Sequence, residues 1–316
     1  MLCRGAMAEA LIAPSSARKQ EESSSVTQLP ALQLYRFNHA TNDLLRNSKQ
    51  RETSILTMST HILAIARNAF REAVRDRILY NLVVFVLLLI ISAIFVGELS
   101  AGAEAKITID LGLSAMLLFG VFIAIFVGVG LVYKEIERRT LYAILSKPVT
   151  RAEFIIGKYL GLCLTLLVNI LVMGIGLSLA IIYLRRGWDP LIPRIFPAIL
   201  LIYIELTLIT GVAMLFSSFS SPALSALLTF FIFVIGHFSA DLKMLSQSTG
   251  NAPARWLLAA LYYGLPNLAN YNFITLAAHG QSPAPRIMLL AISYALVYVA
   301  VLLAATILIF SRRNLK

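Results

Sequence analysis

From residue 79 onward the chain alternates long apolar stretches with short polar ones. A helix needs about 20 residues to cross the hydrocarbon core of a bilayer, and backbone groups inside lipid must hydrogen-bond within their own segment. The sequence therefore predicts an all-α, polytopic membrane protein. Its six predicted transmembrane helices cover residues 79–97, 111–133, 159–184, 195–216, 223–240 and 287–310.

An amphipathic helix is predicted just before the first span, at residues 60–77. Its apolar stripe consists of Ile62, Ile65, Ala66, Ala69, Phe70 and Ala73. Arg67, Arg71 and Arg75 recur on the opposite face at four-residue spacing. A basic amphipathic helix in this place is typical of an elbow helix lying in the headgroup plane, and the alternative is a soluble helix that binds a partner.

Residues 1–57 are rich in Ser, Gln, Asn, Arg and Thr, which predicts a disordered tail. Met58 opens a plausible alternative start, so this tail can also reflect a misplaced start. The predicted six-helix transmembrane domain then covers residues 58–316.

The most charged segment between two spans is the loop at residues 134–158. Its first half has a helical pattern, with Leu141 and Leu145 on the apolar side. Pro148 interrupts this helix, because the residue before a proline is biased out of the α region. Thr150 and Glu153 then form a T-x-x-E capping box that opens a second helix. The loop is therefore predicted to be two helices joined by a rigid elbow.

Two further patterns concern packing and the membrane surface. Gly120, Ala124 and Gly128 recur every four residues in the second span, which favours close helix packing over a substrate contact. Asn169 in the third span is expected to form a hydrogen bond to a neighbouring helix.

The long loop at 241–286 contains a short apolar stretch at 254–263, predicted to be a helix dipping into the outer leaflet of the membrane. Aromatic residues typical of a membrane interface lie around it: Trp256, Tyr262, Tyr263, Tyr271 and Phe273.

Composition agrees with the pattern. The 316 residues are 59% apolar and 14% charged, against about 25% charged in soluble domains. The net charge of +11 could indicate nucleic-acid binding, but the basic residues cluster beside the spans, as cytoplasmic loops require. We therefore expect a lipid bilayer and no nucleic acid as partner.

Orientation follows from the distribution of Lys and Arg after residue 60. With the first span entering from the cytoplasm, thirteen of these residues lie inside and seven outside. This bias predicts both termini in the cytoplasm of a cell whose inner (plasma) membrane holds the protein. The pair Arg185–Arg186 on the predicted outer side runs against it.

The sequence contains no P-loop, HExxH, CxxC or GxSxG motif, so we expect neither catalytic residues nor a metal site. Two ionisable residues fall within spans, Glu205 and His237. One interpretation gives Glu205 a role in binding a substrate, a proton or a metal ion. The favoured interpretation is a structural hydrogen bond from Glu205 to a neighbouring helix. For His237, near the outer end of the fifth span, a structural role is favoured.

The pattern E-x-E-x-x-T-L-x-x-x-L-S-x-P-V-x-R-x-x-F-x-x-G-K, from Glu135 to Lys158, resembles the first cytoplasmic loop of type-2 ABC transporter permeases. The resemblance extends from about residue 61 to 316 and includes the SSFSSP turn at 217–222. Arg139 stands where the family usually has glycine.

This resemblance implies a permease subunit that pairs with a second copy or a sister permease above two separate ATPase subunits, which would hold the ATP. The family's coupling helix would correspond to Glu135, Glu137, Arg138, Thr140, Leu141 and Leu145, as ATPase contacts. Pro148, Arg151, Phe154 and Lys158 would fix the elbow.

A different class of function is an ion- or proton-coupled secondary carrier that uses Glu205. The absence of a visible internal repeat and of interrupted spans argues against it. A membrane enzyme is a third possibility, for which no catalytic constellation is present.

Overall fold

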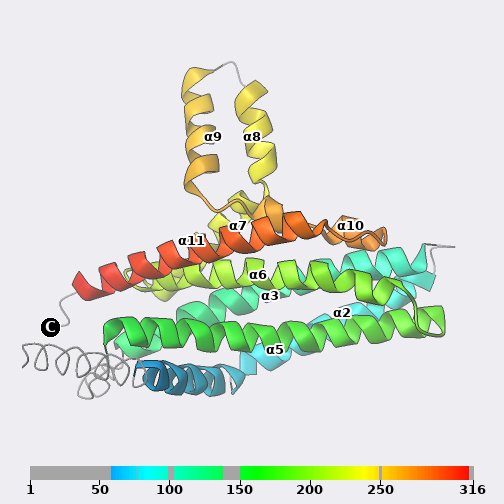
Figure 1. Cartoon of the computed structure of the whole chain (residues 1–316), viewed down its shortest axis with the longest axis horizontal. Coiled ribbons are helices and arrows are strands. Elements are labelled where there is room, and N and C mark those ends of the chain that lie inside the picture. Colours follow the sequence, from blue (N-terminus) through cyan, green and yellow to red (C-terminus); the bar gives the residue numbers. More distant parts are fainter. Residues whose placement is uncertain (1–57, 76, 99–102, 138–149, 249–250, 313–316) are drawn as a thin grey trace, which may run out of the picture. The chain divides into compact units, whose positions relative to one another are not determined.

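The computed structural model describes residues 58–75, 77–98, 103–137, 150–248 and 251–312 (Figure 1). The chain divides into two compact units, Met1–Ser59 and Thr60–Lys316, and the helical bundle belongs to the second. The tail predicted at residues 1–57 lies outside the described residues. Across the described ranges all regular secondary structure is helical, as predicted.

A helix at residues 58–74 precedes the long helices of the bundle. The named elements are α2 (Arg77–Glu98), α3 (Glu104–Glu137), α5 (Arg151–Arg185), α6 (Leu191–Ser217), α7 (Pro222–His237), α8 (Ser239–Ser248), α9 (Ala252–Gly264), the 3-10 helix η1 (Leu268–Tyr271), α10 (Ile274–Ala278) and α11 (Pro285–Arg312).

Four of the described helices are long and apolar enough to cross a membrane: α3, α5, α6 and α11. The bent pair α7–α8 raises this number to five if it forms one span. Within α2, which covers the first predicted span, Val86–Gly97 forms a shorter apolar helix. The described residues therefore support a multi-pass membrane protein with four or five candidate spans, and the count of six stays a prediction.

The fifth predicted span differs from the structure at its end. α7 stops at His237, and α8 continues after a bend of 63°. The sequence of α8, SADLKMLSQS, is too polar to extend an apolar helix, so the chain turns away where the apolar run ends. If α7 and α8 form one span, that span is interrupted at this bend, and otherwise the expectation of uninterrupted spans stays a prediction.

α6 lies at the centre of the bundle and packs against α3, α5, α7 and α11 (Figure 1). Small residues of α3 allow this close approach. A Cβ added at Gly120 would come within 2.5 Å of Leu206, and one at Gly128 within 3.2 Å of Ala213. Ala124 is buried between them. The stripe predicted on the second span is therefore a packing surface against α6, as expected.

The segment predicted as a long outer loop consists mainly of helices. α9 contains the short helix expected at 254–263, and it packs against α8 (Figure 1). Trp256 and Tyr263 are exposed, in agreement with an interfacial position. Tyr271 is not, because its side chain is 1% exposed and its hydroxyl donates a hydrogen bond to the carbonyl oxygen of Ala291. Burial raises the pKa of Tyr271, so the phenol stays protonated and keeps this bond.

The N-terminal helix at 58–74 has the predicted amphipathic faces. Every residue of the predicted apolar stripe is buried or half-buried, whereas Arg67, Arg71 and Arg75 are exposed. Hydrophobic periodicity therefore identified the face that packs against the bundle.

Candidate functional site: the start of α5

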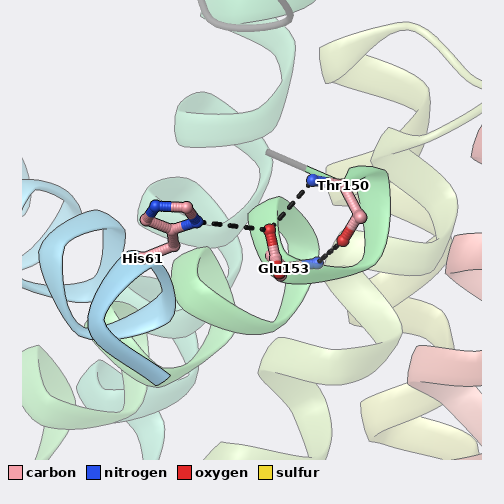
Figure 2. A network of polar contacts seen from close by, with 3 residues as sticks. All are labelled: His61, Thr150 and Glu153. Carbon is pink, nitrogen blue, oxygen red and sulfur yellow. Dashed lines mark hydrogen bonds and ion pairs between the residues drawn. The ribbon is translucent and has the colours of Figure 1, made fainter. Parts of the chain in front are cut away.

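A capping box fixes the first turn of α5. The backbone N–H of Glu153 donates to Thr150 Oγ1 at 3.2 Å, and the N–H of Thr150 donates to Glu153 Oε2 at 2.9 Å. Figure 2 shows both bonds, with His61 on the other side of the Glu153 carboxylate. The T-x-x-E motif thus starts the helix where the sequence predicted, and it satisfies two backbone donors that the first turn leaves free.

One face of this turn contacts the end of α11. The guanidinium of Arg151 donates to the carbonyl oxygens of Phe310 and Ser311, at 2.8 and 3.1 Å. Phe154 stacks on Phe310 with a ring-centroid distance of 6.3 Å. The last carbonyls of a helix lack partners within it and carry partial negative charge, so a guanidinium is a favourable cap. Arg151 and Phe154 therefore attach the start of α5 to the end of α11.

The opposite face contacts the N-terminal helix. A Cβ added at Gly157 would lie 2.8 Å from Ile65, and one at Gly161 would lie 2.5 Å from the carbonyl oxygen of Ala66. Only glycine allows the two backbones to approach this closely. The glycines and Glu153 recur every four residues, which places them on one side of α5.

Charged groups reinforce this second contact. Lys158 is almost fully buried, with its ammonium 3.5 Å from Glu72 Oε2 and 5.8 Å from the centre of the Phe154 ring. The Nδ1 atom of His61 lies 3.8 Å from Glu153 Oε2 (Figure 2). Lys158 therefore contacts Phe154, which packs on α11, and also Glu72 of the N-terminal helix, so it connects the two faces of α5.

These contacts make residues 150–161 a junction of three elements, called the α5 junction below. Three of the predicted elbow residues, Arg151, Phe154 and Lys158, belong to it. Glu135 and Glu137 lie in the last turn of α3. The remaining predicted contacts, Arg138, Thr140, Leu141, Leu145 and Pro148, fall outside the described residues, as do the expected first helix and its elbow.

Sequence reasoning missed the partners of these residues: His61, Glu72, Gly161 and Phe310. The spacing of Gly157 and Gly161 was the available signal, since small residues four apart favour close packing. Nothing in the sequence indicated which helix they meet.

The two predicted intramembrane residues lie together between α6 and α7. Glu205 of α6 is 0% exposed, and its Oε1 atom lies 3.7 Å from Nδ1 of His237 at the end of α7. Within the described residues neither Glu205 oxygen accepts a hydrogen bond at ordinary distance, and the 3.7 Å contact with His237 is an ion pair when the imidazole is protonated. The structural role favoured for Glu205 stays a prediction.

The described residues thus define a polytopic α-helical membrane domain, and they hold no group of three or more His, Cys, Asp or Glu residues that could bind a metal. The chain belongs to the ABC-2 transporter family: residues 63–315 match the family model described as "ABC-2 family transporter protein". It is therefore a type-2 ABC transporter permease, as the loop at 134–158 suggested. A search of curated proteins gave no match. The family membership does not favour an ion-coupled carrier.

Proposed function

We propose that this chain is the transmembrane subunit of an ABC transporter that moves its substrate with energy from a separate ATPase. The observation that supports this most strongly is the family match over residues 63–315. The chain itself would perform no ATP chemistry, since its sequence contains no P-loop. It would work with a second permease, either another copy or a sister subunit.

In this proposal the ATPase contacts residues 135–145, through Glu135, Glu137, Arg138, Thr140, Leu141 and Leu145. These residues connect α3 directly to the α5 junction, so a displacement of this loop reaches Thr150 first. The capping box and helical backbone transmit the displacement along α5. The contacts of Arg151 and Phe154 with α11, and of Gly157 and Lys158 with the N-terminal helix, make these elements follow.

The junction also supports the assignment of this end of the bundle to the cytoplasm. Arg151 and Lys158 belong to the junction, and the exposed arginines Arg67, Arg71 and Arg75 lie on the N-terminal segment that packs against it. Lys and Arg beside spans mark cytoplasmic loops. Both termini would then be cytoplasmic, and the N-terminal helix would lie at the inner surface of the plasma membrane as an elbow helix.

The test is co-purification of an ATPase with the tagged full-length chain from its native membrane. We expect the wild-type chain to retain a P-loop ATPase and the Leu141→Asp and Leu145→Asp variants to lose it, because a buried carboxylate disrupts an apolar contact. Leu257→Asp serves as the matched control, since Leu257 is 62% exposed on α9, away from the junction. Equal recovery of the ATPase with all variants would refute the coupling assignment.

A further inference from the structure

A buried acid in α6 is connected through a histidine to a pocket whose wall is partly polar. Glu205 is fully buried, and His237 Nδ1 lies 3.7 Å from its Oε1 atom. The His237 side chain is 22% exposed and forms part of the pocket wall. Its second ring nitrogen, Nε2, lies 3.4 Å from Nδ2 of Asn272. The ring therefore has one nitrogen toward the buried carboxyl group and the other toward the pocket side.

The pocket is open and has a volume of about 430 Å³. Its polar wall consists of Asp110, Ser114, His237, Asn272 and Thr275. The last part of α6 lies beside the α5 junction, since Gly211 faces Tyr159. α7 begins at Pro222, just after α6, and runs to His237, which lines the pocket. The pocket therefore lies toward the opposite end of the bundle from the α5 junction. Water can reach His237 from this pocket, whereas Glu205 has no exposed surface.

The surroundings of Glu205 require a neutralising proton. A carboxylate removed from water without hydrogen bonds is costly, and the cost falls when a proton is shared with a neighbour. The pair can hold that proton as carboxylate and imidazolium, or as carboxylic acid and neutral imidazole. Both forms contain the same number of protons and have no net charge. The net charge buried between α6 and α7 therefore changes only when the pair gains a proton from the pocket or loses one to it.

We propose that Glu205 and His237 form a proton-binding site in which His237 relays protons between the pocket and Glu205. Before loading, Glu205 is a carboxylate and the neutral imidazole of His237 carries its proton on Nδ1. In the loading step a hydronium ion in the pocket protonates Nε2, and the Nδ1 proton moves to Glu205 Oε1. The ring is then neutral with its proton on Nε2, and the hydronium ion has become water. Unloading is the reverse. This proposal is independent of the ATPase assignment, and the proton is not the source of energy for transport.

Other titratable groups on the elements that pack against α6 are accounted for differently. Asp110 of α3 reaches the same pocket and attracts protons to it. The hydroxyl of Tyr271 in η1 donates to Ala291, and that of Tyr294 in α11 accepts from the N–H of Asn267. From α5, Tyr159 donates to Thr207. Cys163 is buried nearby, and its carbonyl oxygen accepts from Tyr203 of α6 itself. Among the described residues, His237 is the one group in ion-pair contact with Glu205.

Infrared difference spectroscopy of the full-length chain in liposomes, after an acid pH step, tests the proposal. We expect a C=O stretching band from a protonated carboxyl group that Glu205→Gln removes. In His237→Phe, which cannot carry a proton, the band should appear at least about 10-fold more slowly. His279→Phe should leave the rate unchanged, since His279 lies outside the pocket wall with its Nδ1 at 2.7 Å from the carbonyl oxygen of Thr275.

His237→Gln keeps a polar partner for Glu205 and replaces the phenylalanine variant if that variant does not insert into membranes. The same slowing is expected for it. A spectrum without a band assignable to Glu205 would overturn the site, and an unchanged rate in both His237 variants would overturn the relay.

Discussion

At the scale of single residues, Thr150 determines where α5 begins. Replacing it with alanine removes the side-chain acceptor for the Glu153 N–H and should cost about 1 kcal/mol. We therefore expect about fivefold faster hydrogen exchange in the first turn of α5 in Thr150→Ala, measured by mass spectrometry on the purified chain. Thr150→Ser retains the acceptor and should exchange like wild type. Identical exchange in all three proteins would show that the cap does not hold this turn.

Lys158 and Glu72 provide a second residue-scale test, because their charges connect α5 to the N-terminal helix. Lys158→Glu and Glu72→Lys should each lower the thermal stability of the purified chain, and the double reversal should recover part of the loss. The coupling energy should be about 1 kcal/mol, since Glu72 is 42% exposed and water screens the pair. If the two single effects simply add, the pair makes no energetic contribution to the junction.

At the scale of elements, the contact between α5 and the N-terminal helix depends on Gly161. In Gly161→Ala the new methyl group would lie 2.5 Å from the Ala66 carbonyl oxygen and 2.6 Å from Ala69 Cβ, so the helices must separate. Such overpacking should cost about 1–3 kcal/mol and lower the melting temperature. Gly130→Ala is the matched control, because a Cβ there meets nothing within 4 Å.

By helix propensity alone, alanine should be more favourable than glycine at both positions. A Gly161→Ala protein as stable as the Gly130→Ala protein would therefore contradict the close approach of these two helices.

Elements were predictable wherever one local signal dominated. The capping box located the start of α5, and the apolar stripe at 62–73 identified the packed face of the N-terminal helix. The end of α7 was misplaced by three residues, because Phe238 and Ala240 extend the apolar run although the helix ends at His237. Asn169 was expected to bond another helix, but its side-chain amide donates to Thr165 one turn earlier in α5. Long-range partners cannot be inferred from local spacing, as the contact between Glu205 and His237 shows.

At the scale of the whole molecule, the α5 junction joins parts of the chain that are distant in sequence. Arg151 bonds to carbonyls of residues 310 and 311, and Lys158 contacts Glu72, so the first and last described helices both meet α5 near its start. The sequence motif from Glu135 to Lys158 indicated this region through its resemblance to permease loops. The structure adds which side chains connect it to the bundle.

The central claim is that an ATPase docks on the loop just before this junction. Site-specific photo-cross-linking measures this most directly, with a photoreactive amino acid at position 141 of the tagged full-length chain in native membranes. The account predicts an adduct with a P-loop ATPase at position 141, and none when the same amino acid replaces the exposed Leu257 on α9. A second protein carries the photoreactive amino acid at position 145. Absence of adducts from both the 141 and the 145 protein, while an ATPase still co-purifies, would contradict the account, because the ATPase would then bind elsewhere.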